Sequence, residues 1–273
     1  MRKLFSNPLV LIGFMIIASI LLLAIIAPLI APYDPDAIDV KAILLSPSTH
    51  HLMGTDGLGR DVFSRMLYGA RISLMVGFVA VGIATAIGIV LGAIAGFYRG
   101  WTDTFIMRIV DVMLSIPTFF LILAVIAFLT PSIWNIMIVI GLTSWMGVTR
   151  LVRAEFLSLR NREFVLAAQA LGAKDARLIF THLLPNSLTP IIVSSILGIA
   201  SAVLVESGLS FLGLGVQAPQ ASWGNILTDG KEYIQFAWWL SLFPGLAILI
   251  TVLGYNLLGD GLREAYNPRS SQH

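Results

Sequence analysis

Six stretches of the chain are each long and apolar enough to cross a lipid bilayer as a helix. A helix needs about 20 apolar residues to span the hydrocarbon layer, and its backbone groups must be hydrogen-bonded without help from water. The stretches are continuously apolar instead of alternating, which favours helices over a β-barrel. The sequence therefore predicts an all-α integral membrane protein with six transmembrane helices, at about 9–31, 72–97, 104–129, 132–149, 190–213 and 237–258.

The composition agrees with a membrane protein. Of the 273 residues, 57% are hydrophobic and only 12% are charged, against about 25% charged residues in soluble domains. The chain has no cysteine, which excludes disulfides, thiolate metal sites and a cysteine nucleophile. The first apolar run is longer than the core of a signal peptide, about 7–15 residues, and no small-x-small cleavage site follows it cleanly. We therefore expect a retained first span.

The basic residues predict the orientation of the spans. Cytoplasmic loops of membrane proteins carry an excess of lysine and arginine. If the N-terminus is cytoplasmic, twelve of the seventeen basic residues lie inside and only five lie outside, namely Lys41, Arg60, Arg65, Arg71 and Lys231. Both termini and residues 150–189 are then predicted to be cytoplasmic.

Residues 150–189 form a polar stretch that contains six of the seventeen basic residues. Phe164, Ala168 and Leu171 fall at i, i+4 and i+7, which indicates the apolar stripe of a short helix. Gly172 is placed to end that helix as its C′ residue.

A second short helix is predicted to begin near Lys174, with Asp175 at its positive N-terminal end. We expect Pro185 to end this helix, and Pro190 to open the fifth span after Thr189 as its cap. The apolar side of the second helix would consist of Leu178, Ile179, His182 and Leu183. The pattern alone does not choose between two hypotheses, docking of this helix pair to a protein in the cytoplasm or adsorption to the membrane surface.

The spacing within this stretch resembles the EAA loop of ABC-importer permeases, whose pattern is E-A-A, three residues, Gly, nine residues and I-x-L-P. Leu166-Ala167-Ala168, Gly172 and His182-Leu183-Leu184-Pro185 hold that spacing. Leu166 replaces the Glu and His182 replaces the Ile. Both departures are typical of the dipeptide/oligopeptide/nickel branch.

Further motifs along nearly the whole chain resemble the C-type subunit of the permease pair in that branch. They are GTDGLGRDVFSRMLYGARISL at 54–74, SIP at 115–117, SGLSFLGLGVQAP at 207–219, SWG at 222–224 and GDGLRE at 259–264. The resemblance implies the type I ABC-importer permease fold in a bacterial or archaeal cytoplasmic membrane. It also implies three parts: an N-terminal anchor helix with an extracytoplasmic segment (1–70), a core permease domain (71–260) and a short cytoplasmic tail (261–273).

The resemblance further implies partners and a mechanism. The polar stretch would be a coupling loop seated in a cleft of an ATPase subunit, through Phe164, Ala167, Ala168, Leu171, Gly172, Asp175, His182, Leu184 and Pro185. The chain has no G-x-x-x-x-G-K-[ST] motif, so ATP and Mg²⁺ would be bound by two partner ATPase subunits. The other implied partners are a B-type permease chain and an extracytoplasmic solute-binding protein; no nucleic acid is expected.

The outer segment between the first two spans contains candidate contacts for the solute-binding protein. They are Asp56, Arg60, Asp61 and Arg65. Asp61 and Arg65 stand at i, i+4 and are expected to pair on an interfacial helix. The alternative is a solvated helix that rests on the bilayer.

Three ionisable residues are predicted inside the membrane, where unpaired charge is costly. Arg108 and Asp111 stand three residues apart and are expected to neutralise one another. Glu206 has no obvious partner nearby in sequence, and either lines the transport pathway or pairs with the partner permease. Pro117 is expected to kink the third span.

The function expected from these features is the permease subunit of an ATP-driven importer of short peptides, with nickel or a metal chelate as the alternative cargo. A self-sufficient secondary transporter would need repeated halves with broken helices and ion-coupling carboxylates. An intramembrane enzyme would need a catalytic constellation within the spans. Neither pattern is present, and His50-His51 without cysteines does not indicate a metal site.

Overall fold

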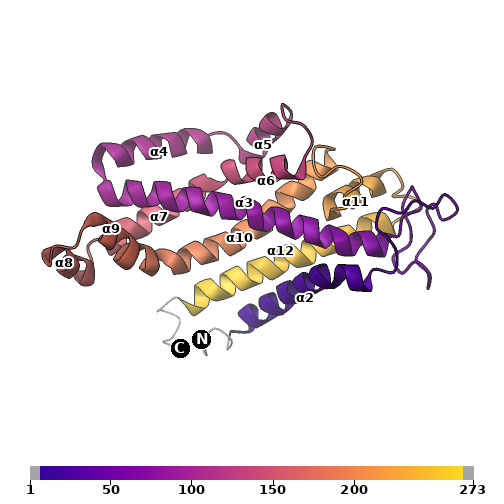
Figure 1. Cartoon of the computed structure of the whole chain (residues 1–273), viewed down its shortest axis with the longest axis horizontal. Helices are drawn as coiled ribbons and strands as arrows, with labels where there is room; N and C mark the ends of the chain where they lie inside the picture. The colour runs from indigo at the N-terminus through magenta and orange to yellow at the C-terminus, as the bar shows by residue number, and fades with distance from the viewer. Residues whose placement is uncertain (1–6, 267–273) are drawn as a thin grey trace.

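The computed structural model describes residues 7–266, which form an elongated bundle of helices that run roughly along one axis (Figure 1). Within these residues no β-strand is formed, and the one β-bridge joins Thr55 to Asp61. The helices are α2 (Pro8–Ile30), α3 (Val62–Tyr98), α4 (Gly100–Leu114), α5 (Thr118–Ile126), α6 (Ile133–Leu142), α7 (Trp145–Leu159), α8 (Glu163–Ala170), α9 (Asp175–Arg177), the π-helix η1 (Leu178–Leu183), α10 (Leu184–Phe211), α11 (Trp223–Lys231) and α12 (Trp239–Ala265).

Five helical segments in the described part of the chain are long and apolar enough to cross a membrane, and α4 with α5 forms a sixth if the bent pair is one span. The expected all-α architecture is therefore confirmed. Several predicted boundaries are wrong. Helix α3 begins at Val62 instead of 72, and the fourth span continues through α7 to Leu159 instead of ending at 149.

The third span is broken where we expected a kink. Helix α4 ends at Leu114, α5 begins at Thr118, and their axes differ by 81°. Pro117 is the N-cap of α5. A proline has no backbone N–H and disfavours helical geometry in the preceding residue, so the chain leaves the helix before Pro117 and restarts after it.

Neither Pro185 nor Pro190 separates the short helices from the fifth span, contrary to our expectation. The helical path continues from α9 through the π-turn η1 into α10, with Pro185 in the first turn of α10 and Pro190 inside it. A π-turn widens the helix locally. Next to Pro185, the Asn186 side chain donates to the His182 carbonyl at 2.6 Å. Residues from Asp175 onward are thus joined to the fifth span by one continuous helical element.

Three glycines on one face of α3 allow α7 to pack closely against it. A Cβ at Gly88, Gly92 or Gly96 would lie 2.5–2.7 Å from the nearest atom of α7. Small residues allow such approach in membranes, where packing replaces the hydrophobic effect as the source of helix association. These glycines therefore serve the packing of α3 against α7.

We expect Gly92→Leu to lower the stability of the solubilised chain by about 1–3 kcal/mol, the usual cost of overpacking a tight contact. A Cβ at Gly92 would meet the Thr149 carbonyl oxygen at 2.6 Å, and backbone cannot move aside easily. Gly82→Leu is the matched control, because nothing lies within 4 Å of a Cβ at Gly82 on the same helix. Thermal unfolding in detergent measures both. Equal midpoints for the two variants would contradict the packing role.

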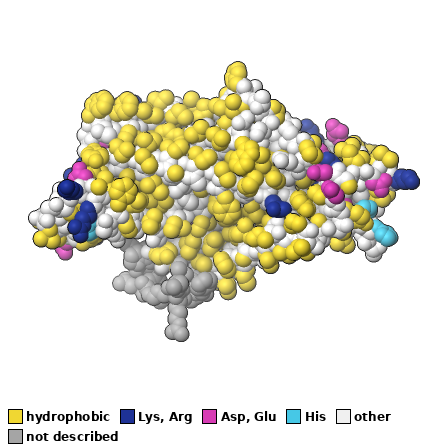
Figure 2. All heavy atoms as spheres, viewed as in Figure 1, with side chains coloured by type: hydrophobic (Ala, Val, Ile, Leu, Met, Phe, Trp, Pro, Cys, Tyr) yellow, Lys and Arg dark blue, Asp and Glu magenta, His cyan; other side chains and the backbone are white. Residues whose placement is uncertain are grey.

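The two ends of the molecule differ in structure. Helices α8 and α9 lie at one end, and α11 with the loop that precedes α3 lies at the other (Figure 1); we call them the α8 end and the α11 end. On the face shown in Figure 2, charged side chains gather at both ends and the surface between them is mostly apolar. That distribution suits a protein whose middle is embedded in lipid.

Candidate coupling surface and outer polar clusters

Helix α8 is anchored to the membrane helices by one buried side chain. Val165 is 1% exposed and lies in an apolar cluster with Phe156 of α7 and with Leu178 and Leu183 of η1. Ala168 is partly buried against the same cluster. These contacts with two other elements, α7 and η1, hold α8 to the end of the bundle. The sequence pattern missed Val165, since it lies off the predicted stripe.

Large apolar side chains at the α8 end are exposed. Phe164 is 43% exposed and Leu171 is 89% exposed, whereas Ala168 of the same predicted stripe is partly buried. Leu166 of α8 and Phe180 of η1 are also exposed, at 50% and 68%. We call Phe164, Leu166, Leu171 and Phe180 the apolar patch; exposed apolar patches mark interaction sites. Phe180 was missed because it lies off the apolar side predicted from Leu178, Ile179, His182 and Leu183.

Gly172 ends α8 as predicted. Its φ is +80°, its N–H donates to the Gln169 carbonyl at 3.0 Å, and the Ala173 N–H donates to the Ala168 carbonyl at 3.0 Å. These two bonds form a Schellman motif, which favours glycine at the left-handed position. The turn fixes the angle between α8 and the next helix.

The remaining predicted residues of the coupling loop lie beside this turn. Asp175 is exposed in the first turn of α9, at the positive end of the helical element. The half-buried His182 ring lies 6.5 Å from the Phe164 ring. Leu184 is partly buried and Pro185 is exposed. Small Ala167 is exposed as well.

The expected Arg108–Asp111 pair is not formed. The Asp111 carboxylate instead accepts a hydrogen bond from Arg150 of α7, while Arg108 is exposed on α4. In the same way Arg153 of α7 donates two hydrogen bonds to Asp103 of α4. The physical reason is that α4 lies against α7, so partners across the helix pair are better placed than neighbours along one helix.

At the α11 end, charged side chains form an internal cluster. The Arg60 Nε donates to Asp56 at 2.7 Å, its terminal nitrogen donates to Asp229 of α11 at 3.2 Å, and the Arg65 Nε lies 3.5 Å from Asp56. Asp56, Arg60 and Arg65 are 1%, 7% and 1% exposed. The interpretation of these side chains as a solvated contact surface does not fit this burial. They tie the outer loop to α3 and α11 instead.

Asp61 does not pair with Arg65, contrary to the expectation from their spacing. Asp61 is the N-cap of α3 and accepts from the Ser64 N–H and the Ser64 hydroxyl, both at 2.8 Å. Its other oxygen lies 3.0 Å from the His51 Nδ1, and its side chain is buried. A carboxylate at the N-cap satisfies free N–H groups of the first helical turn, which competes with the i, i+4 ion pair.

Asp229 joins the outer cluster from α11. Burial raises the pKa of its carboxyl group, an effect that the nearby Arg65 and Arg60 partly oppose. The cluster is thus a set of mutually compensating charges, and removing one member leaves another buried without its partner.

Glu206 is the centre of a second polar cluster and is fully buried. Its carboxylate accepts hydrogen bonds from the hydroxyls of Ser210 at 2.8 Å, Ser222 at 2.9 Å and Ser73 at 3.4 Å. Ser73 belongs to α3, Ser210 to α10, and Ser222 is the N-cap of α11. The expectation that Glu206 lacks partners in its own chain is wrong. The i, i+4 spacing to Ser210 was the available sequence signal.

The same three hydroxyls also accept backbone hydrogen bonds. The N–H groups of Trp223, Val216 and Asn225 donate to the hydroxyls of Ser73, Ser210 and Ser222, each at 3.2 Å. Each hydroxyl thus accepts from a backbone N–H and donates its one proton to Glu206. Glu206 therefore holds the 213–222 loop and the start of α11 against α3 and α10.

Two family models match most of the chain. Residues 1–47 match the N-terminal transmembrane domain of oligopeptide transport permease C, and residues 88–272 match the family described as binding-protein-dependent transport system inner membrane component.

Three curated relatives cover almost all of the chain. The dipeptide transport system permease protein DppC of Alkalihalophilus pseudofirmus is 47% identical over 98% of this chain and 88% of its own length. The probable D,D-dipeptide transport system permease protein DdpC of Escherichia coli is 44% identical over 97% of this chain and 89% of its own length. The oligopeptide transport system permease protein OppC of Bacillus subtilis is 41% identical over 97% of this chain and 87% of its own length.

Among solved structures, an inward-facing form of the MetNI methionine ABC transporter has a similar chain. Its TM-score is 0.62 at 18% identity, over 76% of this chain and 98% of that one. This similarity supports the type I ABC-importer permease fold. Together with the family matches and the relatives, it shows that the chain belongs to the inner membrane permease components of binding-protein-dependent transport systems, and that it is a transport subunit and not an enzyme.

Proposed function

We propose that the chain is the C-type permease subunit of an ATP-driven importer of short peptides. The relatives described above are named for dipeptides, D,D-dipeptides and oligopeptides, and none of the three names nickel. The peptides would be delivered by an extracytoplasmic solute-binding protein. A B-type permease chain would complete the pathway, and two ATPase subunits would bind ATP and Mg²⁺.

The observation that carries the proposal is the apolar patch on a firmly anchored helix. Val165 fixes α8 to the spans, while Phe164 and Leu171 point away from them. An ATPase subunit could bind the exposed apolar face of α8 and, because α8 is attached rigidly, move the spans with it. On this hypothesis the α8 end and both termini face the cytoplasm, and the nine coupling residues predicted from the sequence lie at or beside the contact.

The transport cycle would be rigid-body alternating access. Shifting the populations of two conformations from 1:99 to 99:1 requires about 5.5 kcal/mol of differential binding. Closure of two ATPase subunits would supply that energy, and the continuous helix from α9 through η1 into α10 would transmit the movement directly to the fifth span. A flexible linker at this place would absorb the movement.

The α11 end would face the solute-binding protein. Asp56, Arg60, Asp61 and Arg65 are buried. We therefore propose that they hold the loop beneath this surface in place, and that neighbouring exposed residues make the contact. In this scheme residues 1–70 anchor the chain and supply part of the outer surface, residues 71–260 form the moving permease core, and residues 261–273 are a cytoplasmic tail.

Crosslinking tests the coupling role, and the absence of native cysteine makes single-cysteine variants specific. In the assembled importer, Leu171→Cys is expected to crosslink to an ATPase subunit. Ile192→Cys, which is 52% exposed on α10, is the control and is expected to crosslink only to lipid or the other permease. Capture of lipid alone from Leu171→Cys would contradict the coupling role. An uptake competition between a dipeptide and nickel tests the cargo separately.

A further inference from the structure

One face of α10 lines a cavity within the bundle. Ser194, Gly198, Ser201 and Val205 stand at i, i+4, i+7 and i+11, so they share one side of the helix. They border a cavity of about 230 Å³ whose other walls come from α3, α6 and α7. The residues on this side are small, which leaves the space open.

The cavity is lined by hydroxyl groups although it lies among membrane spans. Thr85 and Ser195 are within 3.0 Å of each other, and Ser201 donates to the Leu197 carbonyl at 3.3 Å. The hydroxyls of Ser144 and Ser194 have no hydrogen-bond partner within residues 7–266. Ser144 is exposed and Ser194 is partly exposed. Their hydroxyls are therefore open to water or to a polar occupant of the cavity.

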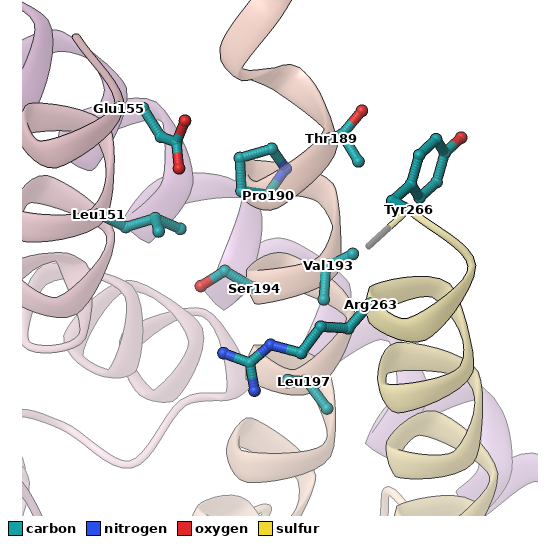
Figure 3. Close-up of a pocket in the computed structure, with 9 residues that line it drawn as sticks. All are labelled: Leu151, Glu155, Thr189, Pro190, Val193, Ser194, Leu197, Arg263 and Tyr266. Atoms are coloured by element: carbon teal, nitrogen blue, oxygen red, sulfur yellow. The ribbon is translucent and has the colours of Figure 1, made fainter. Parts of the chain in front are cut away.

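A second cavity adjoins the first and opens at the α8 end. It has a volume of about 660 Å³ and lies between α7, α10 and α12, with Ser194 common to both cavities. Figure 3 shows Glu155 on one wall and Arg263 and Tyr266 on the opposite wall, with the α10 residues between them. In the described part of the chain neither Glu155 nor Arg263 forms an ion pair. Among residues 7–266, the mouth thus offers one unpaired charge of each sign.

We propose that the two joined cavities form the inner part of the peptide pathway and bind the main chain of the passing peptide. This inference rests on the proposed function and assigns the residues that line the path. Serine and threonine hydroxyls both donate and accept, so they match the N–H and C=O groups of any peptide. Glu155 suits the peptide ammonium and Arg263 its carboxylate, and the small lining leaves room for varied side chains.

The test uses single-cysteine variants in the assembled importer, reconstituted in vesicles that transport a short peptide. Ser194→Cys and Ser201→Cys change one atom each, and Ile192→Cys on the far side of α10 is the lipid-facing control. A charged methanethiosulfonate reagent reacts with the thiolate, which forms in water and not in lipid. We expect labelling at Ser194→Cys and Ser201→Cys and little at Ile192→Cys. A transported peptide at about ten times its KM should slow labelling about tenfold, by simple occupancy.

The outcomes separate the inference from the proposed function. If the unmodified importer takes up no peptide, the proposed function fails. If uptake is normal but Ser194→Cys and Ser201→Cys are unlabelled, the face is packed against lipid or another helix, and the inference fails alone. Labelling that peptide does not slow would also overturn it. Attachment of a bulky reagent at Ser201→Cys is expected to stop uptake without removing the chain from the membrane.

Discussion

Replacement of Gly172 by valine is expected to reduce ATP-driven peptide uptake about tenfold or more while the chain stays in the membrane. Gly172 has a φ of +80° and closes the Schellman turn after α8. A left-handed conformation costs an L-residue about 1–2 kcal/mol, and most for a β-branched one, while 1.4 kcal/mol corresponds to a factor of ten. The turn would open, and the apolar patch would lose its fixed angle to the fifth span.

Gly172→Asn is the matched control, since asparagine tolerates the left-handed region. Nothing lies within 4 Å of a Cβ at Gly172, so neither side chain meets a neighbouring residue and the two variants differ in backbone strain. We expect Gly172→Asn to retain more uptake than Gly172→Val. Uptake, ATP hydrolysis and amount of the chain in the membrane are measured together. Uncoupling appears as continued hydrolysis without uptake, whereas full uptake by Gly172→Val would show that the turn does not transmit movement.

The sequence was sufficient for features that depend on short stretches of chain. Continuous apolarity identified the spans, and the helix stop at Gly172 followed from the glycine after an amphipathic segment. The break at Pro117 is equally local, because a proline restricts only its neighbours. Such features need no knowledge of what packs against them.

Features that depend on distant partners were predicted less well. The spacing of Asp61 and Arg65 suggested an ion pair, but Asp61 is used as a helix cap and Arg65 turns toward Asp56 and Asp229. Asp111 likewise pairs with Arg150 across two helices. Local spacing shows which groups could meet along one helix, and tertiary packing decides which of them do.

The continuity of the coupling segment with α10 was missed for a different reason. Proline usually ends a helix because it lacks an N–H donor. Here the π-turn before Pro185 and the Asn186 side chain, which bonds to the His182 carbonyl, accommodate the ring. The exception depends on backbone widening that the sequence does not reveal.

Replacement of Glu206 by leucine is expected to lower the stability of the chain by about 3 kcal/mol or more. Three buried hydroxyls, on Ser73, Ser210 and Ser222, would lose their acceptor, and each buried group left unpaired costs about 1–3 kcal/mol. Glu206→Gln should cost less, because its amide oxygen still accepts from two of them. The start of α11 should loosen first, since Ser222 is its N-cap.

Thermal unfolding in detergent and the rate of proteolysis near 213–222 measure these effects. Thr251→Val is a control for loss of a buried hydroxyl that bonds only within its own helix, to the Ala247 carbonyl at 2.7 Å. Ser73→Ala should cost less stability in the Glu206→Leu background than in the native chain, because one of the two bonds that Ser73 makes, the bond to Glu206, is already lost there. If Glu206→Leu instead left stability unchanged and altered only the KM for peptide, Glu206 would line the pathway and the structural role would be wrong.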